Sequence, residues 1–274
     1  MAIEQTKNNV RNDHPSVEDY INWGFIHLQN KDYDAALKCF QIMTELEPGN
    51  PKTFINLGHV YEKIDMLDSA KKCYEKALRV KADCIEAIIN IGHIFELQGD
   101  YHNAVEQYTR AIEISPQDVE PRFCLAALYD RHDMYDEAAE EYENIIRIKP
   151  RHTRALHKLG RIRFQDGDYA GALKNFQNVL KLEPENTDAW NDLGSVYEIT
   201  NNVLQAIFTY RKALKVNPLH EETNFNLANA YFSLFLKNPN IVKLEDIIER
   251  LQIVLAQNPN NKKVWDLLNK IKTS

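Results

Sequence analysis

The 274-residue sequence lacks the segments that would place it in a membrane. It contains no run of 18 apolar residues, the length at which a stretch begins to indicate a transmembrane helix. The N-terminal stretch MAIEQTKNNV is too polar for the apolar core of a signal peptide. We therefore expect a soluble, cytoplasmic protein that does not insert directly into membranes.

Basic residues are also fewer than acidic residues. The chain has 33 lysine and arginine residues against 40 aspartate and glutamate residues, which gives a formal net charge of −7. Surfaces that bind nucleic acid or anionic lipid generally carry an excess of positive charge. The charge balance therefore argues against nucleic acid as a partner.

Motifs for catalysis and metal binding are missing as well. The four cysteines form no CxxC and no other metal-ligand spacing, so we expect free thiols in a reducing compartment. The sequence has no glycine-rich phosphate loop, no HExxH and no GxSxG. We therefore predict that the protein is not an enzyme, with no catalytic residues, no metal and no cofactor.

The sequence does contain a pattern that recurs every 34 residues, and it is clearest over residues 85–118. Within this stretch, apolar residues recur at i, i+3, i+4 and i+7 in two short segments, each typical of an amphipathic helix. Gly99-Asp100 separates the two segments, and Ser115-Pro116 ends the second, because proline cannot continue a helix. A fixed period of this length predicts a solenoid built from pairs of helices.

Three ladders of residues fix the register of the repeat. The second helix of each repeat carries an alanine, at Ala36, Ala70, Ala104, Ala138, Ala172 and Ala206. An aromatic residue follows four positions later, at Phe40, Tyr74, Tyr108, Tyr142, Phe176 and Tyr210. The first helix carries a small residue, at Gly24, Gly58, Gly92, Ala126, Gly160, Gly194 and Ala228. Because a glycine inside a helix costs about 1 kcal/mol relative to alanine, small residues in one register indicate close packing.

These ladders resemble the pattern of the tetratricopeptide-repeat (TPR) family over nearly the whole chain. The resemblance implies an all-α fold, a TPR α-solenoid that forms a right-handed superhelix of helix-turn-helix repeats with a C-terminal capping helix. Within residues 15–260 we expect seven repeats, at 17–50, 51–84, 85–118, 119–152, 153–186 and 187–220, and an irregular one at 221–260. Residues 1–14 are polar and aperiodic, so we expect a disordered N-terminal segment. Residues 261–274 are expected to form the capping helix, with Trp265, Leu268 and Ile271 facing inward.

The first helix of each repeat presents a face that the core does not use. Counting from the first residue of a repeat, positions 4, 7, 8 and 11 are expected to be buried, which leaves positions 2, 5, 6, 9, 12 and 13 opposite them. The TPR resemblance implies that this face lines the concave groove of the superhelix. Position 6 is asparagine in four repeats, at Asn22, Asn56, Asn90 and Asn226. Because an amide can bond a passing peptide backbone with little regard to sequence, we predict a protein-binding adaptor or scaffold that holds a partner's peptide segment in this groove, chiefly in repeats one to three.

Other side chains on the same face are expected to add to the binding. A hydrogen bond contributes about 1 kcal/mol net, whereas a micromolar complex needs about 8 kcal/mol, so apolar contacts must supply the remainder. The candidates are Phe25, Ile55, Ile89 and Phe123. The alternative is that these residues pack between adjacent first helices. His59 and His93, both at position 9, are expected to be polar residues of the groove rather than metal ligands.

Repeat five changes the character of this face to basic. Arg154, Lys158 and Arg161 lie on its first helix, and repeat six places Asp188 and Asp192 at the positions equivalent to the first two. The acids and bases of neighbouring repeats can pair internally, or the basic residues can recruit an acidic ligand. An exposed ion pair contributes under about 1 kcal/mol, which leaves both outcomes open.

The alternative function is structural. The chain would then be a subunit that uses repeat packing and the irregular seventh repeat for self-association or for assembly into a multiprotein complex. Phe232, Phe235 and Leu236 would form the docking edge, and the protein would be a homo-oligomer through its C-terminal repeat.

Overall fold

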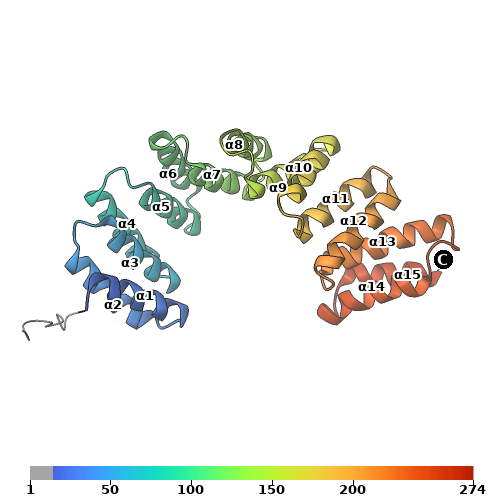
Figure 1. Ribbon diagram of the computed structural model, residues 1–274, viewed down its shortest axis with the longest axis horizontal. Coiled ribbons are helices and arrows are strands. Elements are labelled where there is room, and N and C mark those ends of the chain that lie inside the picture. The colour runs from blue at the N-terminus through green and yellow to red at the C-terminus, as the bar shows by residue number, and fades with distance from the viewer. Residues whose placement is uncertain (1–14, 274) are drawn as a thin grey trace, which may run out of the picture. The chain divides into compact units, whose positions relative to one another are not determined.

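The computed structural model describes residues 15–273, and over this range it consists of fifteen α-helices without a β-strand (Figure 1). The prediction of an all-α fold is therefore confirmed. The expectation of disorder at residues 1–14 lies outside the described residues. The chain divides into two compact units, residues 1–132 and residues 133–274, and each is described by itself.

The first unit contains seven helices, which are α1 (Val17–Gln29), α2 (Tyr33–Leu46), α3 (Pro51–Lys63), α4 (Leu67–Val80), α5 (Ile85–Leu97), α6 (Tyr101–Ile114) and α7 (Val119–Arg131). From α1 to α7, consecutive helices pack against one another. The odd-numbered helices are the first helices of the repeats, and Figure 1 shows them in one layer with the even-numbered helices in another.

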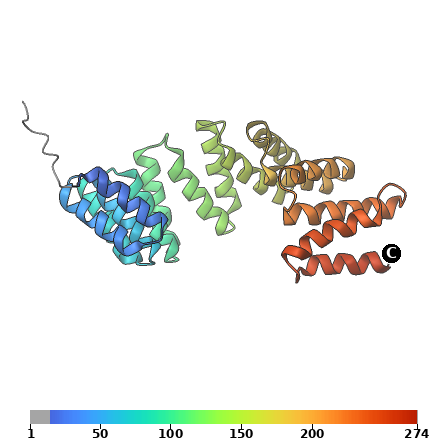
Figure 2. The same ribbon diagram turned by 60° about the horizontal axis from the view of Figure 1, so that its bottom comes forward.

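The second unit contains α8 (Tyr135–Ile148), α9 (Thr153–Gln165), α10 (Tyr169–Leu182), α11 (Thr187–Ile199), α12 (Val203–Val216), α13 (Glu221–Lys237), α14 (Leu244–Gln257) and α15 (Lys262–Thr273). Helix α13 has 17 residues where α9 and α11 have 13, so part of the insertion in the seventh repeat lengthens its first helix. Figure 2 shows α13, α14 and α15 stacked side by side at the C-terminal end.

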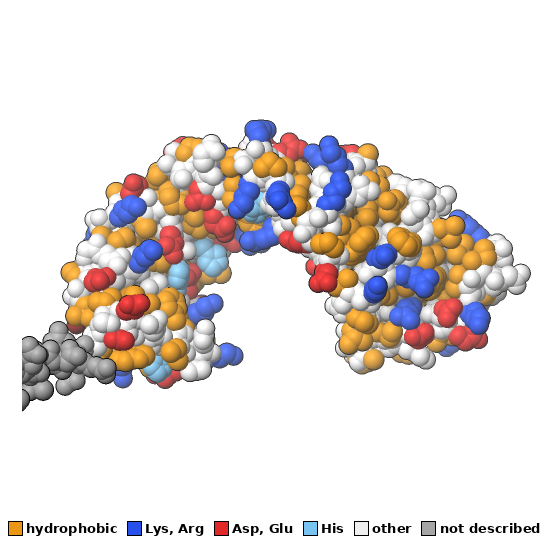
Figure 3. Space-filling view, in the orientation of Figure 1, with side chains coloured by type: hydrophobic (Ala, Val, Ile, Leu, Met, Phe, Trp, Pro, Cys, Tyr) orange, Lys and Arg blue, Asp and Glu red, His pale blue; other side chains and the backbone are white. Residues whose placement is uncertain are grey.

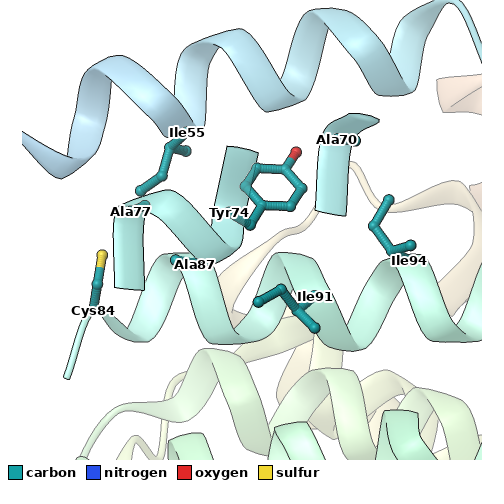
Figure 4. Close-up of a cluster of buried hydrophobic side chains, with 8 residues drawn as sticks. All are labelled: Ile55, Ala70, Tyr74, Ala77, Cys84, Ala87, Ile91 and Ile94. Carbon is teal, nitrogen blue, oxygen red and sulfur yellow. The ribbon is translucent and has the colours of Figure 1, made fainter. Parts of the chain in front are cut away.

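The core forms where the two helices of one repeat meet the first helix of the next repeat. Figure 4 shows Tyr74 of α4 between Ile55 of α3 and Ile91 of α5, and all three side chains are buried. Helix α1 has no preceding repeat among the described residues. Consequently Trp23 and Ile26, which occupy positions 7 and 10 of α1, are exposed although the same positions are buried in α3 and α5.

The expectation for Trp265 in the last helix is wrong. Its side chain is 47% exposed, and its indole N–H donates to the carbonyl of Pro259 at 2.9 Å. Trp190 makes the equivalent bond to Pro184 at the start of α11, so α15 begins in the manner of a first helix. The need to satisfy the indole N–H holds the ring over the preceding turn, and Val264 and Leu267 occupy the buried face instead.

Each glycine at position 8 of a first helix touches the aromatic ring of its own repeat. A Cβ atom added to Gly92 would lie 2.7 Å from Cε1 of Tyr108, and the glycines of the other repeats meet their rings in the same way. Contacts this short leave no room for a methyl group unless the ring shifts. The close approach of the two helices of a repeat therefore depends on this pair.

Gly92→Ala should lower the free energy of unfolding by about 1–3 kcal/mol, because the added methyl group overpacks the contact with Tyr108. Chemical denaturation followed by circular dichroism measures the change. Gly49→Ala is the matched control, since a Cβ atom there has nothing within 4 Å. Equal effects of the two substitutions would contradict the assignment of Gly92 to a packing contact.

The turn between the two helices of a repeat has one backbone conformation in six repeats. The residue at position 15 has a φ between 58° and 81°, and it is Lys31, Asp65, Gly99, Asp133, Gly167 or Asn201. Glycine adopts this left-handed conformation without strain, whereas a lysine there costs about 1 kcal/mol or more. The backbone at Lys31, in the turn of the first repeat, is therefore strained.

Lys31→Gly should relieve this strain and raise the free energy of unfolding by about 0.5–1 kcal/mol. Gly99→Ala should have the opposite effect and about the same size, because it introduces a side chain at a φ of 75°. Urea denaturation of both variants tests the pair. A loss of stability in Lys31→Gly would be the contrary result.

Candidate functional site

The structure brings two of the predicted groove residues into contact. The side-chain amide of Asn90 on α5 donates to Nε2 of His59 on α3, at 3.0 Å. Asn56 is half-buried on the same face of α3, and Asn22 is exposed on α1. The face that carries these residues on α1, α3 and α5 is called the asparagine face below.

A carboxylate organises the neighbouring part of this face. Glu62 at the end of α3 accepts a hydrogen bond from the hydroxyl of Tyr74 at 2.5 Å, and its other oxygen lies 3.1 Å from Nδ1 of His93. Burial by itself raises the pKa of a carboxyl group, but hydrogen bonds from His93 and Tyr74 outweigh it and hold the pKa of Glu62 below its ordinary value. The carboxylate therefore stays charged and fixes His93 across the gap between repeats.

The same arrangement recurs at position 12 of other repeats. Glu96 accepts from the hydroxyl of Tyr108 at 3.1 Å and pairs with Arg131 of the next first helix. In the second unit, Glu198 accepts from the hydroxyl of Tyr210 at 2.8 Å and from the amide of Asn229 at 2.9 Å. Each glutamate thus connects the second helix of its own repeat with the first helix of the next repeat.

The hydrogen bonds of these glutamates were not predicted above, although the sequence carries a signal for them. Repeats one and five have phenylalanine, which lacks a hydroxyl, in place of the tyrosine, and their residues at position 12 are the apolar Leu28 and Phe164. The repeats that pair a tyrosine with a glutamate at position 12 are those of Glu62, Glu96 and Glu198. Comparing the two positions across repeats would have predicted the hydrogen bond.

Two of the four predicted apolar contacts are corrected by the structure. Ile55 is 1% exposed and Phe123 is 7% exposed, so packing between helices, the alternative considered above, applies to both. Ile89 is half-buried and packs against the core around Tyr108. Phe25 is exposed, although its ring makes an edge contact with Phe40, 5.5 Å between centroids. Of the four candidates, Phe25 and Ile89 therefore keep apolar surface that a ligand can contact.

The basic candidates lie on α9, in the second unit. Arg154, Lys158 and Arg161 follow one another along α9, and Arg154 and Arg161 are exposed. The acids of α11 contact histidines, Asp192 with His157 at 2.9 Å and Asp188 with His220 at 3.2 Å. These contacts show that the two aspartates take part in internal pairing.

Asn226 differs from Asn56 and Asn90 in its surroundings. Its amide donates to the side-chain oxygen of Asn191 at 3.1 Å, and the hydroxyl of Thr223 donates to the same oxygen at 3.0 Å. Asn191 and Thr223 are buried. The amide group of Asn226 is thus engaged within a buried network of the second unit.

The predicted docking edge of the seventh repeat is mostly inside the protein. Phe232 is buried with Ile247 and Leu251, and Phe235 packs against the same cluster. Leu236 is exposed. Of these three residues, Leu236 alone offers an open apolar surface within the described part of the chain.

No described helix combines the length and apolar character needed to cross a membrane. Residues 15–273 also hold no group of three or more histidine, cysteine, aspartate or glutamate side chains placed to bind a metal ion.

Glu62 holds the pKa of His93 above its ordinary value, chiefly through their hydrogen bond. Since the pKa is raised in the folded state, the stabilisation by this pair is complete below the unfolded value of about 6.5 and is lost as the pH rises through the folded value. NMR titration should therefore give His93 a midpoint above about 6.5, and Glu62→Gln should lower that midpoint. Glu45→Gln, an exposed change on α2, is the control, and an unaltered midpoint in Glu62→Gln would refute the pairing.

Comparison with known sequences identifies the repeat. Family profiles described as TPR repeat match residues 92–132 and 160–198, and profiles described as tetratricopeptide repeat match residues 51–84, 125–174 and 187–218. Together these matches cover more than half of the chain. No curated protein sequence matches it.

Comparison with solved structures shows the same fold. The C-terminal part of a TPR repeat-containing protein from Cytophaga hutchinsonii is 18% identical with a TM-score of 0.68, and the alignment covers 89% of this chain and 98% of that one. Pseudomonas aeruginosa pilF is 14% identical with a TM-score of 0.66, covering 80% and 97%. YrrB, described as a TPR protein with an unusual peptide-binding site, is 20% identical with a TM-score of 0.54, covering 67% and 95%.

Proposed function

Because the chain belongs to the tetratricopeptide-repeat family, we propose that it is a cytoplasmic adaptor or scaffold that holds an extended segment of a partner protein on its asparagine face. Repeats of this family generally act as non-catalytic scaffolds for protein interactions. YrrB, which shares the fold, has a peptide-binding site. These likenesses support a protein partner, and the residues of the asparagine face support the place where it binds.

The observation that carries the proposal is the pair of amides on α3 and α5. Among the described residues, the half-buried side chain of Asn56 makes no hydrogen bond, so its donors and its acceptor are open to a ligand. Asn90 donates one N–H to His59, and its oxygen and second N–H remain available to a ligand. The bond to His59 also restrains the side chain of Asn90, which lowers the entropy lost on binding.

The spacing of these amides suits an extended chain. Side chains of α3 and α5 touch, and helices in contact lie about 8–10 Å apart. A polyproline II segment advances about 3.1 Å per residue with three residues per turn. Successive asparagines would therefore meet backbone groups about three residues apart, on the same side of such a segment. One amide per repeat matches one turn of the ligand.

Charge on the asparagine face is largely balanced by internal pairs. Glu62 is paired with His93, and Glu96 with Arg131. Recognition would accordingly rest on backbone hydrogen bonds, with Phe25 and Ile89 as the apolar contacts. The partner segment is expected to carry an aliphatic or aromatic residue near α1, where Phe25 is exposed.

Self-association through the seventh repeat is the second candidate. Leu236 and Ile241, on either side of the break at Asn238-Pro239, are both exposed. A homo-oligomer through this edge should dissociate in the variant Leu236→Lys, Ile241→Lys. Sedimentation equilibrium of wild-type protein at several concentrations decides whether there is an oligomer to dissociate, and a monomer throughout rules this candidate out.

The main proposal is tested with Asn56→Ala, Asn90→Ala. Peptides are first selected from a random library displayed on phage against wild-type protein, and their Kd is then measured by calorimetry. Losing two hydrogen bonds of about 1 kcal/mol each should raise Kd about 30-fold. Alanine favours helix over asparagine, so the double variant should keep its thermal stability.

Asn178→Ala is the matched control, because it removes an amide from α10, a second helix that belongs to the other unit. It should leave Kd unchanged. Selected peptides that bind the double variant as tightly as wild-type protein would refute the asparagine face as the binding site.

A further inference from the structure

Helix α12 breaks a pattern that the five preceding second helices keep. At positions 18 and 22 those helices carry only polar residues or alanine, as the pairs Asp34 and Lys38, Asp68 and Lys72, His102 and Glu106, Asp136 and Glu140, and Ala170 and Lys174. In α12 the two positions are Leu204 and Phe208. A change to two large apolar residues, at positions that otherwise face solvent, is the first sign of a second interaction surface.

The structure leaves both side chains open to solvent. Leu204 is 69% exposed and Phe208 is 56% exposed. Four residues apart on a helix, they lie one above the other on the same face. Adjoining exposed apolar side chains of this size are typical of protein interaction sites rather than of scattered surface residues.

Leu204 and Phe208 begin a stripe along α12, and basic residues extend it. Arg211, Lys212 and Lys215 follow Phe208 on α12, and the helix contains no acidic residue. Nζ of Lys212 lies 5.3 Å from the centre of the Phe208 ring. Figure 3 shows hydrophobic and basic side chains together over the region of α12. This apolar and basic surface belongs to a chain whose net charge is −7.

A pocket of about 470 Å³ lies beside this stripe, and acidic side chains line its opposite wall. Arg211 and Lys215 line it from α12, and Asp246 and Glu249 line it from α14. Glu249 is paired with Arg250 at 2.9 Å. Among the described residues, Arg211, Lys212 and Lys215 make no ion pair with a carboxylate. Their charges are therefore available to a ligand that carries acidic groups.

We propose that the α12 surface, formed by Leu204, Phe208, Arg211, Lys212 and Lys215, docks an acidic amphipathic helix of a partner protein. Aliphatic residues of that helix would cover Leu204 and Phe208, and its aspartates or glutamates would meet the three cations. Charge complementarity selects the partner, since acidic segments are drawn to this stripe while basic segments are repelled.

The probe is a fluorescein-labelled 18-residue peptide with leucine on one helical face and glutamate on the other. Its partner probe has lysine in place of every glutamate. By fluorescence anisotropy, full-length protein should bind the glutamate peptide at least about tenfold more tightly than the lysine peptide. Raising the salt concentration to about 0.5 M should weaken binding of the glutamate peptide, because exposed charges are screened.

The variant Leu204→Asp, Phe208→Lys installs the pair that repeats one and two carry at the same positions. It should therefore fold, and it should lose at least about tenfold in affinity for the glutamate peptide. Leu46→Lys is the matched control, since it removes an exposed leucine from α2. The variant Asn56→Ala, Asn90→Ala should bind the peptide as wild-type protein does, which separates this surface from the asparagine face.

Three results would overturn the proposal. One is equal affinity for the two peptides, or no loss of affinity in Leu204→Asp, Phe208→Lys. Another is sedimentation of the protein with phosphatidylserine vesicles when the glutamate peptide does not bind, which would assign the surface to lipid. The third is a wild-type dimer that Leu204→Asp, Phe208→Lys converts to a monomer, which would assign the surface to a second copy of the chain.

Discussion

The contact between a glycine on the first helix and an aromatic ring on the second, present in five repeats, is the constraint on which the rest of the structure depends. A Cβ atom at Gly58 or Gly194 would lie 2.4 Å from the ring of its own repeat, so the ring packs directly against the backbone of the first helix. Interiors packed this densely tolerate little change in volume. The distance between the two helices, and with it the position of the next repeat, follows from this one pair of residues.

The same rings connect the core to the candidate binding face. In three repeats the ring is a tyrosine whose hydroxyl donates to a glutamate at position 12, as Tyr74 does to Glu62. The glutamate in turn holds His93 of the next repeat. A residue selected for packing thus fixes polar side chains on the surface, and such preorganised groups lose less entropy when a ligand binds. The asparagine face and the α12 surface differ in this respect, since α12 offers exposed apolar side chains and unpaired cations.

The candidate site could be predicted from the sequence only in part. Helical periodicity placed Asn56, Asn90, His59 and His93 on one face, and the structure puts Asn90 in contact with His59. The same periodicity also assigned Ile55 to that face, yet Ile55 is buried. A helical wheel gives the direction in which a side chain points, but burial depends on how the neighbouring helices cross above it.

The sequence by itself determined the family, the pairing of helices and the register, because a 34-residue period with small, aromatic and proline positions is a property of the chain alone. Only the tertiary structure decided which side chains stay accessible and which pair across repeats. Glu62 and His93 are 31 residues apart in the sequence, and nothing local brings them together. The exposure of Leu204 and Phe208 was decided in the same way, because an apolar residue is buried only where another helix packs against it.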